Sequence, residues 1–136
     1  LPHVTLCQFR AQNNESAVAL VTDSIGIEFD VSISEIYVKH HVTSDGYWVG
    51  FNVLRGPQLI EAQSRIVRSL ERQSIETLTG SRDEYFPHFT VARILLGKVP
   101  LDLLLSDKTL LSRTIPCRLK LGVSDENGQF VSILAA

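Results

Sequence analysis

Cysteine is scarce in this sequence, and its two copies, Cys7 and Cys117, stand far apart. They have neither the spacing of a metal site nor the framework of a small secreted domain, so no disulfide scaffold is indicated. We therefore expect two reduced, buried thiols with a structural role.

Long apolar runs are also missing. None approaches eighteen residues, and no signal-peptide pattern opens the chain. These absences argue against a membrane partner and favour a cytoplasmic location. What remains, 44% apolar and 21% charged residues in 136 positions, is typical of one globular domain with a real core.

One pattern is present twice, in residues 2–6 (PHVTL) and 87–91 (PHFTV), which both read Pro-His-x-Thr-apolar. Side chains at i and i+2 of a strand point the same way, so each copy places an imidazole beside a hydroxyl. A third His-x-Thr, at residues 41–43, lacks the flanking residues and runs into a Ser44-Asp45-Gly46 turn signal. We interpret this third copy as chance.

Two such strands facing each other would form a pocket suited to phosphodiester hydrolysis. One imidazole, from His3 or His88, would take a proton from the attacking water, and the other would give a proton to the departing ribose oxygen. Thr5 and Thr90 would donate hydrogen bonds to the non-bridging phosphate oxygens. This chemistry requires no metal.

The paired motifs resemble those of the 2H phosphoesterase superfamily, which includes bacterial 2'-5' RNA ligase-like proteins and cyclic nucleotide phosphodiesterases. The resemblance implies hydrolysis of 2',3'-cyclic phosphates or 2'-5'-linked oligonucleotides without metal or cofactor, and some bacterial members also join RNA ends. It implies that His3 and His88 are the acid/base pair and that Thr5 and Thr90 bind phosphate. The second motif continues as Val91-Ala92-Arg93, as it often does in the bacterial branch, whereas residues 7–10 (CQFR) depart from the familiar continuation.

Arg93 is an open candidate for phosphate binding. Its family position argues for that role, but strict alternation from His88 sends residue 93 to the opposite face unless the strand contains a bulge. Gln8 has the matching offset in the first copy and would be a weaker donor.

The aromatic residues near the motifs have two interpretations each. Tyr85 and Phe86 precede the second motif and would stack on a nucleobase, although Phe86 is equally compatible with the core. Trp48 alternates with Tyr47 and Val49, so we expect it on the other strand face, covered by a helix. His40 and His41 are expected at the surface.

The apolar periodicity predicts alternating strands and helices. The expected elements are a strand at 2–9, a helix from Asn14 to about 24, a strand from Phe29 with a bulge near Ser34-Glu35, a strand at 47–53, a helix at 57–73, the second motif strand, a helix from Pro100 to Leu111, and strands near 114–124 and 129–134 around a 125–128 turn.

From each motif the predicted order is the same, which indicates an internal duplication. We expect an α+β, two-lobed fold resembling that of the 2H phosphoesterases, with antiparallel sheets around a central cleft and helices outside. The single domain, 1–136, would divide into lobes of roughly 1–54 and 55–136. The first copy has no preceding strand and helix, so either the chain is a trimmed member or that pair lies outside the sequence.

Two functional hypotheses follow, an enzyme and a nucleotide or RNA-end binding module with little catalysis. The intact His and Thr quartet favours the enzyme, because a binder needs no pair of proton-transfer groups. A metal hydrolase is a poor third, since no carboxylate cluster or metal-ligand spacing accompanies the histidines. The net charge of −2 favours a small nucleotide or an RNA end over an extended duplex.

Overall fold

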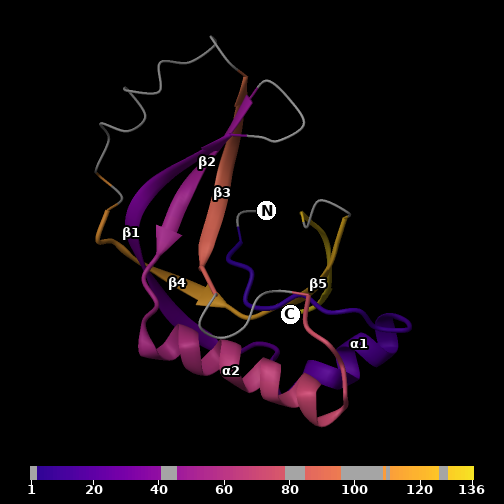
Figure 1. The fold of residues 1–136 in the computed structure, drawn as a ribbon. Coiled ribbons are helices and arrows are strands. Elements are labelled where there is room, and N and C mark those ends of the chain that lie inside the picture. Colours follow the sequence, from indigo (N-terminus) through magenta and orange to yellow (C-terminus); the bar gives the residue numbers. More distant parts are fainter. Residues whose placement is uncertain (1–2, 41–45, 79–84, 96–108, 110, 126–128) are drawn as a thin grey trace.

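The computed structural model describes residues 3–40, 46–78, 85–95, 109, 111–125 and 129–136. In chain order the elements are α1 (Asn14–Val21), the 3-10 turn η1 (Thr22–Ser24), β1 (Glu28–His40), β2 (Gly46–Val53), α2 (Pro57–Arg72), β3 (His88–Leu95), β4 (Thr114–Arg118), β5 (Leu121–Ser124) and β6 (Phe130–Ala135). This arrangement confirms an α+β fold. Figure 1 shows α2 lying across one end of a curled sheet, with α1 beside it.

The strands form two antiparallel sheets of unequal size. One has four strands in the order β3-β2-β1-β4, and the other is the β5–β6 hairpin. The two-lobed duplicated arrangement stays a prediction. The expected turn at 44–46 and the expected helix from Pro100 fall largely on residues 41–45, 96–108 and 110, which lie outside the described part of the chain.

Both described helices begin where the sequence signals predict. The Asn13 side chain accepts a hydrogen bond from the Ser16 N–H at 2.8 Å, and the Ser16 hydroxyl oxygen accepts one from the Asn13 N–H at 3.2 Å. This capping box satisfies two backbone donors at the start of α1. In α2, Pro57 occupies the first turn, where its missing N–H costs nothing.

The predicted bulge in β1 is confirmed. Pairing with β2 shifts between Ile33 and Glu35, so Ser34 is the extra residue. The bulge keeps Ile33 on the same face as Ile36, although their spacing is odd. The apolar side chains of the long strand therefore share one face along its whole length.

The expected first strand is wrong as a sheet element. Residues 3–8 form no strand, and the segment has only an isolated bridge between Phe9 and Thr77 and a hydrogen bond from the Leu78 N–H to the Gln8 carbonyl at 2.7 Å. Leu6 enters the core, and residues 3–5 and 7–9 are all half-buried. An alternating apolar pattern does not specify a backbone partner.

The expected strand at 114–124 is two strands that belong to different sheets. Leu119 lies between them and is buried, with its N–H donating to the Ile27 carbonyl at 2.8 Å and its carbonyl accepting from the Gly26 N–H at 2.9 Å. These bonds hold the chain at the point where it passes from one sheet to the other.

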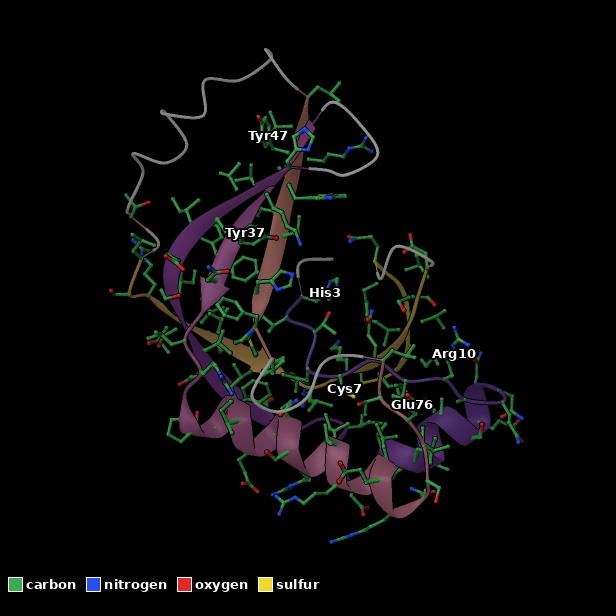
Figure 2. All side chains as sticks on the ribbon, in the orientation of Figure 1. His3, Cys7, Arg10, Tyr37, Tyr47 and Glu76 are labelled. Carbon is green, nitrogen blue, oxygen red and sulfur yellow. The ribbon has the colours of Figure 1, made fainter. Side chains whose placement is uncertain are left out.

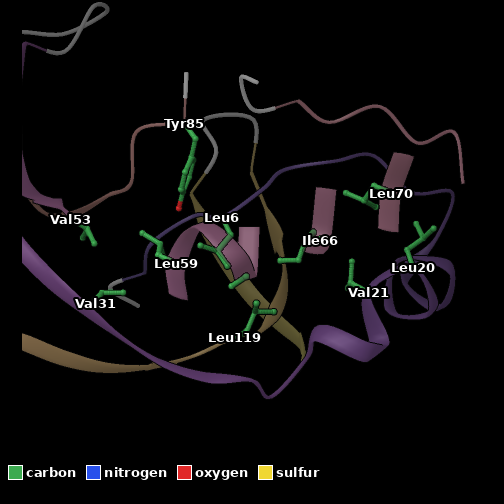
Figure 3. Close-up of a cluster of buried hydrophobic side chains, with 11 residues drawn as sticks. Leu6, Leu20, Val21, Val31, Val53, Leu59, Ile66, Leu70, Tyr85 and Leu119 are labelled. Carbon is green, nitrogen blue, oxygen red and sulfur yellow. The ribbon is translucent and has the colours of Figure 1, made fainter. Parts of the chain in front are cut away.

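The core lies between α2, the end of the sheet that carries Val31 and Val53, and the N-terminal segment with Leu6 (Figure 3). Leu59 and Leu70 of α2 are 1% and 0% exposed. The other members of the buried cluster are Leu6, Leu20, Val21, Val31, Val53, Ala62, Ile66, Tyr85 and Leu119. The helix predicted at 57–73 is confirmed, and its apolar residues Leu59, Ala62, Ile66 and Leu70 are buried in this cluster.

Neither described helix combines the length and the apolar character that a membrane crossing requires.

We expect Leu59→Ala to lower the free energy of unfolding by about 2–5 kcal/mol, because it leaves a cavity in a packed core. Leu54→Ala is the matched control, since Leu54 is 53% exposed, and should change that free energy by less than about 0.5 kcal/mol. Urea denaturation measures both. Equal losses would contradict the placement of the core.

Candidate active site

The pairing of β1, β2 and β3 determines which side chains of the second motif share a face. Asn52 pairs with Glu35 on one side and with His88 on the other, and Gly50 pairs with Tyr37 and Thr90. Directly paired residues of antiparallel strands project to the same face. We call this face the motif face. His88 and Thr90 lie on it as the i, i+2 spacing predicts.

His88 is exposed at the first position of β3, and one of its ring nitrogens has a protein partner. Nδ1 lies 2.9 Å from the Phe86 carbonyl oxygen. A carbonyl oxygen only accepts hydrogen bonds, so Nδ1 carries the proton and donates it. This contact fixes the tautomer and assigns proton exchange with a substrate to Nε2.

Tyr37 of β1 connects the two motif residues and was not predicted. Its hydroxyl lies 2.6 Å from the Thr90 hydroxyl oxygen, and its ring meets the His88 ring edge to face, with centroids 5.5 Å apart. Figure 2 shows Tyr37 within the sheet. The phenol therefore holds Thr90 through a hydrogen bond while its ring supports the imidazole.

Gly50 makes this contact possible. A Cβ atom at residue 50 would lie 2.7 Å from the Tyr37 Cε1 atom and 2.9 Å from the Thr90 Cα atom, and it would also overlap the Phe89 carbonyl oxygen. The absence of a side chain lets the tyrosine cross the middle strand. A glycine inside an alternating strand marks such close approaches, and it is the signal in the sequence that could have indicated Tyr37.

A bulge in β3 settles the position of Arg93. Gly50 pairs with Thr90 but Val49 pairs with Ala92, so Val91 has no partner in the ladder. The extra residue reverses the alternation beyond it, and Arg93 pairs with Trp48 on the motif face. Its guanidinium carbon lies 5.9 Å from the centroid of the indole ring.

The group that covers the Trp48 ring differs from the expectation. Trp48 lies on the face opposite Val49, as predicted, and it is half-buried. We expected a helix to cover Trp48. Among the described residues, however, it is the Arg93 guanidinium that lies over the indole ring. Cross-strand pairing brought a cation to the indole, which alternation within one strand cannot predict.

His3 and Thr5 lie in the N-terminal segment and line a cavity of about 910 Å³ together with residues of β4, β5 and β6. The His3 ring is 5.2 Å from the ring of Phe130, and in the view of Figure 2 it lies between β3 and the β5–β6 hairpin. His88 and Thr90 are not among the described residues that line this cavity. The structure thus places His88 and Thr90 on one sheet face and His3 and Thr5 on the lining of one cavity, and the facing of the two histidines across one cleft stays a prediction.

The expectation that Tyr85 stacks on a nucleobase is wrong. The side chain is 5% exposed within the core, and its hydroxyl has no hydrogen-bond partner in the described part of the chain. Burial raises its pKa above the ordinary range of a phenol. Phe86, the other candidate, is 71% exposed and its ring is available for stacking.

The remaining candidates have ordinary surroundings. His40 is exposed, as expected, and meets Tyr47 edge to face, while His41 lies outside the described residues. Gln8 is half-buried and bonds Leu78 through its backbone carbonyl.

Both cysteines are free and half-buried, less buried than expected. Burial, and secondarily the charge of Asp30, raises the pKa of the Cys117 thiol, so this thiol stays protonated. Within the residues that the structure describes, no group of three or more His, Cys, Asp or Glu side chains is arranged to hold a metal ion.

No family model, curated protein or solved structure matches this chain. The likeness to the 2H phosphoesterases therefore depends on the residues of the two motifs themselves.

We expect Gly50→Ser to lower the free energy of unfolding by about 1–3 kcal/mol, because its side chain would overlap Tyr37 and the β3 backbone. Gly56→Ser is the matched control. A Cβ atom at Gly56 meets nothing within 4 Å, and serine is favoured at this helix N-cap. Thermal or urea unfolding of the two variants measures the difference. If both cost the same, close approach is not the reason for glycine at position 50.

Proposed function

We propose that this chain is a metal-independent phosphodiesterase that acts on 2',3'-cyclic phosphates or on 2'-5'-linked nucleotide or RNA ends. The observation that carries the proposal is the pair His88 and Thr90. An exposed imidazole, with one nitrogen already occupied by a carbonyl, lies on the same sheet face as a hydroxyl held by a phenol. These are the groups needed to move a proton and to bind a phosphate oxygen.

In this mechanism the two imidazoles take opposite roles. The base accepts a proton from water as the water oxygen attacks phosphorus, and the acid donates a proton to the ribose oxygen as the P–O bond breaks. His88 would act through Nε2, because Nδ1 is committed to the Phe86 carbonyl. His3 would take the remaining role. After one turnover the base holds the proton taken from water and the acid has given its proton to the ribose oxygen, and proton exchange with solvent restores the starting state.

The hydroxyl groups bind the phosphate in this scheme. When Tyr37 donates to the Thr90 oxygen, the Thr90 proton is directed toward a non-bridging phosphate oxygen, and the two successive hydrogen bonds polarise each other. Thr5 would make the equivalent bond from the first motif. Arg93 adds a positive charge to the same sheet face, one row beyond Thr90, and would bind a phosphate next to the reacting one.

We expect the purified protein to hydrolyse 2',3'-cyclic nucleotides or 2'-5' oligoadenylate in the presence of a chelator. His88→Ala and His3→Ala should each lower kcat/KM by at least about 10²-fold, the usual scale for a positioned acid or base. Thr5→Ala and Thr90→Ala should cost less, because each removes one neutral hydrogen bond. Product formation is followed by chromatography of the released phosphomonoester or nucleotide.

His40→Ala is the matched control for these variants, since His40 is an exposed histidine that pairs with Tyr47 on the face opposite the motif face. It should retain the wild-type rate. Loss of activity in chelator, or full activity in the double variant lacking both motif histidines, would contradict the mechanism. Binding of the same nucleotides without turnover would support a binding module instead.

The rate should depend on pH in a bell-shaped manner. At low pH both imidazoles are charged and no base is present, and at high pH both are neutral and no acid is present. Measurements of kcat/KM from about pH 4 to pH 9 test this expectation. A profile with one limb only would show that one histidine does not take part in proton transfer.

A further inference from the structure

A row of two cations and an aromatic ring crosses the motif face beyond Thr90. Trp48 on β2 pairs with Lys39 on β1 and with Arg93 on β3. Lys39 and Arg93 are exposed and the indole is half-buried. We refer to Lys39, Trp48 and Arg93 as the cationic row.

The cationic row lies a fixed distance from the candidate catalytic residues. Along β2, residues 52, 50 and 48 mark three successive rows on one face, which contain His88, Thr90 and Arg93 respectively. Residues two apart on a strand are separated by about 7 Å. This spacing is close to the length of one nucleotide in an extended single strand.

The chemistry of the row suits a nucleotide. Guanidinium and ammonium groups bind phosphate, and an indole face stacks on a nucleobase without sequence preference. Among the described residues of β1, β2 and β3, the carboxylates on this face are Glu35, which accepts a hydrogen bond from the Asn52 side chain at 2.7 Å, and, on the other side of the β1 bulge, Glu28 and Asp30. All three lie at the His88 end of the face or farther along β1, two or more rows away from the cations.

We propose that the cationic row is a second nucleotide subsite, which selects RNA ends that carry a phosphate on the 5' side of the terminal nucleoside. This inference rests on the proposed hydrolysis at His88 and Thr90. The terminal cyclic phosphate lies at those residues, the next phosphate lies between Lys39 and Arg93, and a base stacks on Trp48. A nucleoside cyclic phosphate with a free 5'-hydroxyl leaves the two cations without a ligand.

Three substrates of increasing length test the subsite, namely adenosine 2',3'-cyclic phosphate, the same compound with a 5'-phosphate, and a dinucleotide that ends in adenosine 2',3'-cyclic phosphate. The second and third should exceed the first in kcat/KM by about tenfold to a hundredfold, the worth of a charged hydrogen bond. The readout is the ratio of kcat/KM for a longer substrate to kcat/KM for the first substrate. This ratio should fall toward one in Lys39→Gln. Arg65 is an exposed charge on α2, so the control Arg65→Gln should keep the wild-type ratio.

Binding is measured independently of turnover through the fluorescence of Trp48, the only tryptophan in the chain. In the His88→Ala variant the dinucleotide should quench the emission at a lower concentration than the 5'-hydroxyl mononucleotide. The difference should shrink at high salt, because it depends on phosphate contacts.

The outcomes separate the two proposals. Equal kcat/KM for the three substrates, or a preference that survives Lys39→Gln, would overturn the subsite and leave the hydrolysis intact. Absence of turnover with all three, together with dinucleotide quenching that is weakened by Lys39→Gln, would overturn the hydrolysis and support the subsite.

Discussion

The register between β2 and β3 is the constraint on which the candidate site depends. Because Val91 is skipped in the pairing, one strand presents His88, Thr90 and Arg93 to the same side despite their uneven spacing. A ladder without the bulge would move Arg93 to the apolar face and leave the indole of Trp48 without its guanidinium. The register between β1 and β2 places Tyr37 opposite Gly50, and the register between β2 and β3 places Thr90 there as well, so the hydrogen bond between Tyr37 and Thr90 depends on both.

Local signals in the sequence predicted local structure well. Asn13 and Pro57 mark helix starts through backbone groups within one turn, and both helices begin there. The odd spacing between Ile33 and Ile36 predicted the bulge in β1, because a change of parity within one strand is visible in the sequence. His88 and Thr90 share a face because side chains at i and i+2 of a strand point the same way, and this spacing is also visible in the sequence.

Features that depend on a contact with a distant segment could not be predicted from local signals in the sequence. Residues 3–8 alternate in the sequence like a strand, yet they form no strand in the structure. Alternation within a segment does not indicate which other segment it would pair with. The contact between Arg93 and Trp48, the hydroxyl pair of Tyr37 and Thr90, and the burial of Tyr85 are all set by neighbours distant in sequence. For Arg93 the sequence left two alternatives open, and only the pairing partner decided between them.

The passage of the chain from β4 to β5 determines where the hairpin lies relative to the first motif. Leu119 is held by two backbone hydrogen bonds, so Lys120 is the one residue that separates this anchor from the hairpin. Leu121 and Ala135 form the near end of the hairpin, and Ser124 and Phe130 form the far end. Phe130 therefore lies at the end of the hairpin farthest from the Leu119 anchor along β5. Its ring lies 5.2 Å from the ring of His3, so a residue of the last strand, β6, lies beside the imidazole of the first motif.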